Sequence, residues 1–383
     1  MAGKAAGLDA SYARYYFTPE GPRPGASAAQ MEPSSPSTPL RPRPPIARHG
    51  AALFYIMKHV LPAIARTGRR PVIFSRWSGM GDIISTFPAA LELRRRHPGS
   101  RFIYNCDPHF AALAHAGGVA DECTSFPEVG VIGHWHRFLL AGFYHFAHGD
   151  DVPGTFSREP MFVEFCRQFG VAAPGSHPSL AVDAAALGRV KALLAARNVA
   201  AENLILFHTG PTWPVKEWPA EHWAALADGL RSGGYPNLAQ AGLGAYMASQ
   251  QTQLPHSLGH TVDLGAASVP AIPGAVSLLD ALSLGEIIGL ISLARLVVGI
   301  DSGLLHIAAC VRTPAVGIFG PTLPAMFYEE KVRANFVGAT VDCAGCHHRV
   351  PRLHWITGCP YDVKCMKQIP PGEVLRACLA ALA

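Results

Sequence analysis

Four residues that follow one apolar run could together bind an anion. Asp301, Ser302 and Gly303 end the run, and His306 lies one helical turn further on. Free backbone N–H groups at the start of a helix attract anions, and an imidazole one turn on could reach the same oxygens. The grouping predicts a phosphate-binding turn, although Asp301 alone could be a helix cap and His306 alone a buried core histidine.

A second polar segment, HTGPTWPVK at residues 208–216, contains a candidate cation. Lys216 lies just before a predicted helix, where an ammonium could neutralise a diphosphate and stabilise a leaving group. The alternative is an ordinary solvent-exposed lysine. Small and hydroxyl-bearing residues that could contact phosphate lie in the same loop, at Thr209, Gly210 and Thr212.

A third segment offers a carboxylate. Asp82 begins a helix after the loop RWSGMG at residues 76–81. A positioned carboxylate can remove the proton from an attacking hydroxyl, but Asp just before an apolar helix is also a good cap. The residues alone leave both roles open. Gly79 and Gly81 would allow the loop to approach a substrate closely.

Each of these segments follows an apolar run that predicts a buried strand. Such strands are expected at 72–75, 101–106, 204–207, 238–240, 261–264, 296–300 and 315–319. Helices are expected at 82–96, 158–169, 184–197, 218–231, 285–294 and 304–311. Strand, turn, helix and strand within residues 295–322 form one parallel βαβ unit. Open α/β sheets bind ligands at the carboxyl ends of such strands, where all three polar segments lie.

Two other regions have patterns that fit more than one structure. Residues 117–155 are rich in Gly, His and aromatics, which is typical of a binding loop or an insertion. Apolar residues form a helical stripe at positions 53, 56, 57, 60, 61 and 64. This helix is expected to pack on the first domain, although His59, Arg66, Arg69 and Arg70 would also suit a membrane surface.

Length and composition favour two domains. The chain has 383 residues, 49% of them hydrophobic, which is too long for one ordinary core. Residues 1–50 contain nine of the 33 Pro and predict a disordered extension. The first domain is then expected at 51–198 and the second at 199–383. The net charge of +5 comes largely from the extension, so nucleic-acid binding has little support.

Nine cysteines, no recognisable signal peptide and no apolar run of membrane-spanning length predict a soluble, cytoplasmic protein. Four of the cysteines are candidates for a structural zinc site: Cys343, Cys346, Cys359 and Cys365. Only the first pair has the close spacing typical of zinc ligands. The alternatives are reduced structural thiols, or disulfides in an oxidising compartment.

Three blocks of the sequence resemble motifs of the heptosyltransferases, glycosyltransferase family 9. They are RWSGMGDIISTFPAALELRRRHPGSRFIY from residue 76, HTGPTWPVKEWPAEHWAALADGL from residue 208 and GIDSGLLHIAACVRTPAVGIFGPTLP from residue 299. The blocks occur in the family's order, and the resemblance covers roughly residues 70–380. It implies the α/β architecture called GT-B, in which two Rossmann-like domains with parallel sheets face each other across a cleft.

The resemblance also implies an activity. An inverting enzyme would move a heptose-like sugar from a nucleotide diphosphate-sugar, such as ADP-heptose, to lipopolysaccharide or another glycan. Such an acceptor would allow a peripheral contact with the inner membrane. Asp82 matches the family's general base and Lys216 its diphosphate-binding lysine. The donor would lie against Thr209, Gly210, Thr212, Lys216, Asp301, Ser302, Gly303 and His306, and the acceptor against Ser78, Gly79, Met80 and Gly81. No catalytic metal is required, because cations and N–H groups can stabilise a diphosphate.

One stretch departs from the family pattern. The family usually has an acidic residue after the strand near 238–241 to hold the donor's ribose, but AQAGLGAYMASQQTQLPHS, from residue 239, contains none. The identity of the nucleotide therefore stays open. The alternative function is a non-catalytic nucleotide-sugar or carbohydrate-binding protein on the same scaffold. A nucleotide-sugar epimerase is less consistent, because such enzymes lack these three blocks.

Overall fold

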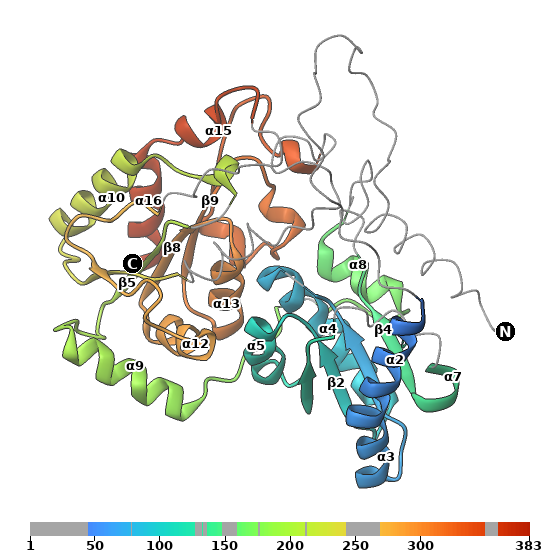
Figure 1. Cartoon of the computed structure of the whole chain (residues 1–383). Coiled ribbons are helices and arrows are strands. Elements are labelled where there is room, and N and C mark those ends of the chain that lie inside the picture. Colours follow the sequence, from blue (N-terminus) through green and yellow to red (C-terminus); the bar gives the residue numbers. More distant parts are fainter. Residues whose placement is uncertain are drawn as a thin grey trace, which may run out of the picture.

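The computed structural model of the chain describes residues 45–77, 79–126, 132, 136–147, 159–174, 177–210, 213–242, 269–348 and 359–383. These residues form two parallel β-sheets that lie in separate halves of the molecule, each with helices packed against it (Figure 1). The fold class is α/β, as the sequence predicts. None of the described helices combines the length and the apolar character needed to cross a bilayer.

The first sheet has the strand order β3-β2-β1-β4, with every pair parallel. Its strands are β1 (Val72–Ser75), β2 (Phe102–Asn105), β3 (Glu122–Thr124) and β4 (Gly142–His145). The helical elements of this half are α2 (Pro45–Tyr55), the π-helical turn η1 (Ile56–Val60), α3 (Leu61–Thr67), α4 (Met80–Arg96), η2 (Pro108–Phe110), α5 (Ala111–Ala116), α7 (His136–Leu139) and α8 (Met161–Gln168).

Successive side chains of this sheet point to opposite faces. Val72 and Phe74 of β1 lie in a core with α4 and α8, whereas Ile73 between them lies in a separate core with Tyr55 and Val60 of the N-terminal helix. This two-residue period follows from strand geometry. Both faces of the sheet are therefore covered, as is usual for a parallel sheet.

The second sheet has the order β10-β9-β8-β5-β6-β7, again all parallel. Its strands are β5 (Ile205–His208), β6 (Leu238–Gln240), β7 (Val276–Ser277), β8 (Leu296–Ile300), β9 (Ala315–Phe319) and β10 (Val337–Gly338). The helical elements are α9 (Ala184–Ala196), η4 (Pro214–Lys216), α10 (Ala220–Ser232), α12 (Leu284–Leu293), α13 (Gly303–Val311), η6 (Pro324–Met326), η7 (Val332–Asn335), η8 (Cys346–His348), α15 (Lys364–Lys367) and α16 (Pro371–Leu382).

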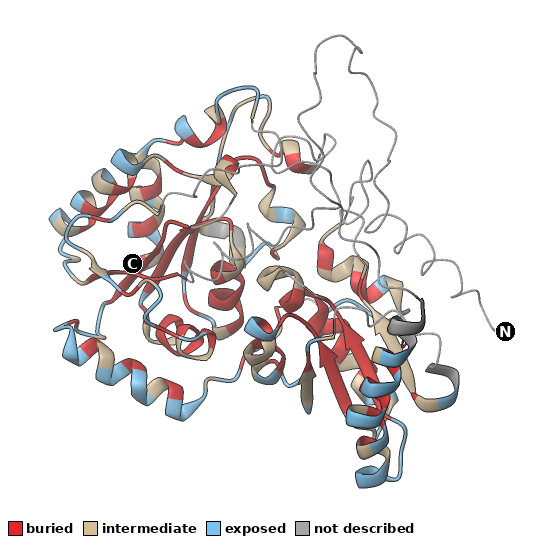
Figure 2. Cartoon of the chain, viewed as in Figure 1, coloured by how far each residue is buried: buried red, intermediate tan, exposed pale blue. Residues whose placement is uncertain are grey.

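Helices also join the two halves. One face of the second sheet packs on α10 and α16, and the other packs on α12 and α13. The helices α12 and α13 in turn contact α5 and α4 of the first half. A single cluster of buried residues contains Phe87 of α4, Ile287 of α12 and Leu305 of α13. The interface is therefore apolar and continuous with both cores, so burial holds the carboxyl ends of the two sheets together (Figure 2).

Several expected elements differ in detail. Residues 117–155 contain β3, α7 and β4, so part of the stretch expected to be a loop or an insertion belongs to the first sheet. The predicted strand at 261–264 lies outside the described residues. So do residues 1–44 of the predicted extension, while residues 45–50 begin α2. The boundary after residue 198 stays a prediction, although α9 packs on α12 of the second half, with Arg189 Nε 2.7 Å from Glu286 Oε1.

The N-terminal helical segment α2–η1–α3 forms where the apolar stripe predicts a helix, but its buried face is different. The buried side chains are Ala52, Tyr55, Ile56, Val60 and Ala63. Residues 53, 57 and 61, which the stripe assigned to the core, are exposed. Both sides of this helix carry large apolar residues, so the period alone could not identify the side that faces the sheet.

Candidate active site between the two sheets

Each sheet has a point at which the order of its strands reverses. In the second sheet the chain runs from β5 outward to β6 and β7, then returns to β8 on the other side of β5. In the first sheet it runs from β1 to β2 and β3, and β4 then joins the other side of β1. Ligands of open α/β sheets bind outside the carboxyl ends of the strands at such points. The three predicted polar segments directly follow β1, β5 and β8.

An ion pair joins the segments after β5 and β8. Lys216 Nζ lies 2.7 Å from Asp301 Oδ2, and the hydroxyl of Thr322, after β9, donates to the same oxygen at 2.8 Å. The side chains of Lys216 and Asp301 are only 12% and 7% exposed. Lys216 is therefore not a solvated surface lysine. Asp301 is not the cap of α13, because the N-cap position belongs to Ser302.

This pair is charged despite its burial. Burial raises the pKa of the Asp301 carboxyl, but the ammonium of Lys216 and the hydrogen bonds from Lys216 and Thr322 outweigh that effect, and the net pKa is lowered. A lysine ammonium has three N–H donors, so the contact with Asp301 leaves Lys216 able to bind a phosphate as well. The arrangement thus holds one cation at the carboxyl edge of the second sheet.

The N-terminus of α13 and the Lys216–Asp301 pair form one wall of the site, on the side of the second sheet. Gly303 is the first residue of α13, and Ser302 caps it without a side-chain hydrogen bond. The Ser302 Oγ is buried and has no hydrogen-bond partner among the described residues. A bound anion beside the free N–H groups of the helix would satisfy such a hydroxyl. The binding of phosphate at this turn stays a prediction.

His306 lies one turn into α13 and is enclosed by aromatic rings. Its ring centroid is 4.4 Å from that of Tyr328 and 6.3 Å from that of His177. Burial and, to a smaller degree, the charge of His177 lower the pKa of His306 to about 3. At neutral pH the imidazole is therefore uncharged. It can donate one hydrogen bond to a ligand but supplies no positive charge.

Asp82 lies on the opposite wall, in the first turn of α4. The guanidinium of Arg76, which follows β1, donates through Nη2 to Asp82 Oδ2 and through Nη1 to the carbonyl of Phe146 at 3.2 Å. The N-cap of α4 is Gly79, so the capping role considered for Asp82 is wrong. Its side chain is 33% exposed, which leaves room for a substrate hydroxyl.

The two walls touch each other through glycines. A methyl group added at Gly81 would lie 2.6 Å from His306 Cδ2, and one added at Gly303 would overlap the side chain of Met80. Only glycine permits approaches this close. The charges of Asp82 and Lys216 both act on His306. The structure thus brings the three predicted segments together between the two sheets.

The structure gives less information on the other predicted site residues. Ser78 and Thr212 lie outside the described residues. Thr209 is buried, and its hydroxyl accepts a hydrogen bond from Gln240 Nε2 at 2.8 Å, so this side chain already has a partner. Gly210 is buried beside Thr209, with a φ of 136° that favours glycine. Their contact with phosphate stays a prediction.

Three residues of the site were missed by sequence reasoning. Arg76 and Thr322 each follow a buried strand closely, which is the same signal that identified Asp301. Tyr328 packs against both His177 and His306 and donates to the Ser302 carbonyl at 3.4 Å. No local pattern marks Tyr328, because its role depends on packing between distant segments.

The four C-terminal cysteines influence one another without forming a metal centre in the described residues. The pKa of Cys365 is raised to about 11, first by burial and then by the nearby thiols of Cys343, Cys346 and Cys359. The four thiols are therefore near neighbours. Within the described parts of the chain, no three His, Cys, Asp or Glu side chains are arranged to hold a metal ion. The structural zinc stays a prediction.

Known structures of the same architecture were found by comparison. Over 82% of its length, the chain superposes on 98% of Escherichia coli ADP-heptose LPS heptosyltransferase II, with a TM-score of 0.57 and 17% identity. It also superposes on 76% of the iron-containing dodecameric glycosyltransferase TibC of enterotoxigenic E. coli H10407, with a TM-score of 0.59 and 19% identity over 82% of this chain. These two likenesses show that the chain has the fold of the GT-B glycosyltransferases.

Sequence comparison narrows this class. The model of glycosyltransferase family 9 (heptosyltransferase) matches residues 143–356, more than half of the chain. Lipopolysaccharide heptosyltransferase 1 of Pseudomonas aeruginosa is 24% identical over 320 residues, which span 72% of this chain and 85% of that protein. The chain belongs to glycosyltransferase family 9.

Proposed function

We propose that the protein transfers a heptose from ADP-heptose to a lipopolysaccharide or related glycan acceptor, with inversion at the anomeric carbon. The observation that carries this proposal is the contact between the first turn of α4, with Asp82, and the first turn of α13, with His306, beside the Lys216–Asp301 pair. The names of the similar proteins, which are LPS heptosyltransferases, support the choice of donor and acceptor.

The donor diphosphate would bind the second-domain wall. Lys216 supplies a fixed cation, and the N–H groups at the start of α13 with the Ser302 hydroxyl supply neutral donors. As the bond between the anomeric carbon and the phosphate oxygen breaks, negative charge grows on the leaving nucleotide diphosphate. Donors already fixed in place stabilise this charge more than the ground state.

The acceptor would bind the first-domain wall. Its hydroxyl attacks the anomeric carbon from the side opposite the leaving diphosphate, and its proton passes to Asp82. Arg76 holds the Asp82 carboxylate in one orientation through Nη2. The close contact of the two walls at Gly81 and Gly303 limits the entry of water, which would otherwise compete with the acceptor hydroxyl.

A comparison of two carboxylate variants tests this assignment. Purified protein is incubated with a panel of nucleotide-sugars, including ADP-heptose, and with a heptose-free lipopolysaccharide acceptor. We expect Asp82→Asn to lower kcat by about 100-fold or more, since a positioned general base contributes that much, while ADP still binds. The matched control is Asp183→Asn at the N-cap of α9, away from the site, which should keep wild-type turnover.

Two results would contradict the proposal in different ways. Full activity of Asp82→Asn would remove Asp82 as the base. Binding of a nucleotide-sugar with no transfer by wild type to any acceptor would instead support a non-catalytic binding protein.

Metal content should be measured on the same preparation. Thiolates prefer zinc or iron, and TibC is described as iron-containing, so elemental analysis should cover both metals. A structural metal bound by the cysteines at 343, 346, 359 and 365 would be found at close to one equivalent per chain. Turnover should then continue when a chelator is added, because a structural metal takes no part in the transfer. Less than about one-tenth of an equivalent would end this prediction.

A further inference from the structure

The N-terminal helical segment α2–η1–α3 has an outward face with unusual composition. Large hydrophobic side chains along it are exposed: Leu53 by 58%, Phe54 by 66%, Met57 by 60% and Leu61 by 46%. In the described part of the chain, only Phe138, Tyr361 and Leu379 are also exposed large hydrophobics. Four of the seven such residues therefore lie on one face of one helical segment. Exposed apolar groups gathered in this way mark an interaction surface.

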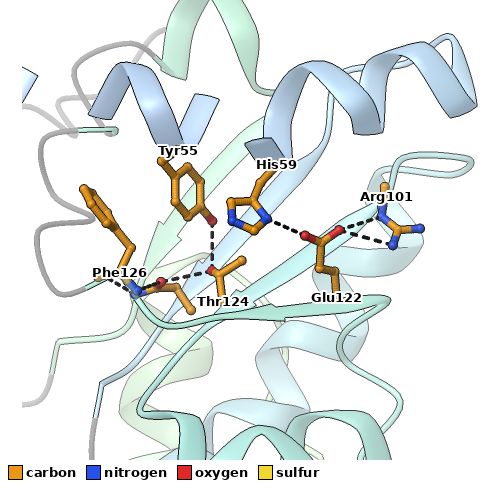
Figure 3. Close-up of polar contacts among 7 residues, drawn as sticks. Tyr55, His59, Arg101, Glu122, Thr124 and Phe126 are labelled. Atoms are coloured by element: carbon orange, nitrogen blue, oxygen red, sulfur yellow. Dashed lines mark hydrogen bonds and ion pairs between the residues drawn. The ribbon is translucent and has the colours of Figure 1, made fainter. Parts of the chain in front are cut away.

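Polar contacts fix this face outward. Tyr55 Oη lies 2.9 Å from Thr124 Oγ1 of β3, and His59 Nδ1 lies 2.5 Å from Glu122 Oε1 (Figure 3). The other carboxylate oxygen of Glu122 accepts a hydrogen bond from Arg101. Tyr55 and His59 are one turn apart, so both point to the sheet. A rotation that buried Phe54 or Met57 would break both contacts. The apolar face is thus a fixed feature of the fold.

The charged side chains of this segment itself all have one sign. Residues 45–70 contain five Arg or Lys and no Asp or Glu. Lys58, Arg66, Arg69 and Arg70 are exposed, and Lys58 Nζ lies 5.9 Å from the centre of the Phe54 ring. Cations that flank exposed Phe, Leu and Met residues on a helix are the pattern of a segment that lies in the headgroup region of an anionic membrane.

We propose that the face formed by Leu53, Phe54, Met57 and Leu61 binds the surface of an anionic lipid bilayer. The apolar side chains enter the boundary between headgroups and acyl chains, and the flanking cations contact lipid phosphates. A second copy of the chain fits this face poorly, because a two-fold interface would place the same acid-free, cationic segments against each other. The inference is independent of the sugar donor and of Asp82.

Vesicle sedimentation tests the proposal directly. Full-length protein is centrifuged with vesicles of phosphatidylglycerol mixed with phosphatidylcholine, and with vesicles of phosphatidylcholine alone. We expect binding to the anionic vesicles at about 1 mM lipid and much less to the neutral ones, since each Lys or Arg contributes about fivefold near an anionic surface. Added salt should weaken the binding.

Matched variants distinguish binding through this face from nonspecific adsorption to vesicles. Phe54→Gln with Met57→Gln should weaken binding by at least about tenfold, because two apolar side chains that would enter the bilayer are lost. The control is Tyr361→Gln in the other half, where the ring is also exposed, by 55%, and also has a lysine nearby, with Lys364 Nζ 5.4 Å from its centre. Phe54→Trp should keep binding and shift its fluorescence to shorter wavelength with anionic vesicles, which shows insertion of this residue.

Several results would overturn the proposal. If the wild-type protein stays in the supernatant with anionic vesicles, it has no membrane-binding surface. If Tyr361→Gln weakens vesicle binding as much as the Phe54→Gln/Met57→Gln pair does, the face has no specific role in that binding. A wild-type dimer in analytical ultracentrifugation that the Phe54→Gln/Met57→Gln pair makes monomeric would assign the face to a second copy. Since the three substituted positions are exposed, unchanged thermal unfolding should accompany every variant.

Discussion

The two carboxylates of the site have different surroundings, and this difference separates their roles. Asp301 is buried and bonded to Lys216 and Thr322, so its carboxylate organises the edge of the second sheet. Asp82 is one-third exposed and bonded to Arg76 on one oxygen. A substrate hydroxyl can therefore reach Asp82 more easily than Asp301. The sequence alone could not make this distinction, because both residues follow an apolar strand.

The ion pair gives a prediction about stability and binding. Lys216→Met should lower the free energy of unfolding by about 3–5 kcal/mol, because it leaves the Asp301 carboxylate buried without a counter-charge. It should also weaken binding of ADP. The control Lys367→Met removes an exposed pair with Asp362 and should cost less than about 1 kcal/mol.

A double variant separates the two effects. Lys216→Met with Asp301→Asn restores part of the stability, because no buried charge is left unpaired, but it should not restore ADP binding. Urea denaturation and calorimetric titration measure the two quantities. Tight ADP binding by the double variant would show that Lys216 does not contact the diphosphate.

The neutral state of His306 gives a prediction about pH. Its pKa is lowered from 6.5 to about 3 in the folded protein, first by burial. The unfolded state therefore binds the proton more tightly, and the free energy of unfolding falls as the pH falls below about 6.5. At pH 5 this one group should account for a loss of about 2 kcal/mol relative to neutral pH.

The comparison with His306→Gln isolates this contribution. Other buried histidines, such as His177 and His208, also have a lowered pKa and remain in both proteins. Urea midpoints of the variant should therefore fall less steeply between pH 7 and pH 5. Parallel slopes for the two proteins would show that His306 is not buried in its neutral form.

At the scale of elements, the site depends on how closely α4 approaches α13. In Gly303→Ala the added methyl group meets Met80 and forces the two helix ends apart by up to about 1 Å. Because a misplacement of this size disturbs the alignment of the reacting groups, kcat/KM should fall by about 100-fold. Steady-state kinetics with ADP-heptose measures this effect. Gly188→Ala within α9 is the matched control, because no atom lies within 4 Å of the added methyl group.

The control should also behave differently in stability. A glycine replaced by alanine inside an exposed helix stabilises it by about 0.5–1 kcal/mol. Gly188→Ala should therefore unfold at a slightly higher temperature with unchanged kinetics. Wild-type kinetics in Gly303→Ala would mean that the contact between α4 and α13 does not shape the site.

The sequence predicted some elements to the residue and missed others. β1, β8 and β9 have the predicted bounds because each is an uninterrupted apolar run that ends at a polar residue or glycine. β3 has the sequence ECT and is only partly buried, so it carries no apolar signal. The buried side of the N-terminal helix was wrong for a different reason, because large apolar residues lie on both of its sides.

At the scale of the whole molecule, the site is a product of tertiary structure. Lys216 and Asp301 are separated by 85 residues, and their contact depends on the parallel pairing of β5 with β8. The pairing of Arg76 with Asp82 is local, but the approach of this pair to α13 depends on the shared core of the two halves. Most residues of the site could be identified from the sequence, but which of them contact one another is determined by the tertiary fold.

A structure of the protein with a bound nucleotide diphosphate-sugar would test the interdomain site most directly. We predict that the diphosphate lies between Lys216 Nζ and the N-terminus of α13, and that the anomeric carbon faces the Asp82 carboxylate. A diphosphate bound elsewhere, or an anomeric carbon turned away from Asp82, would contradict it.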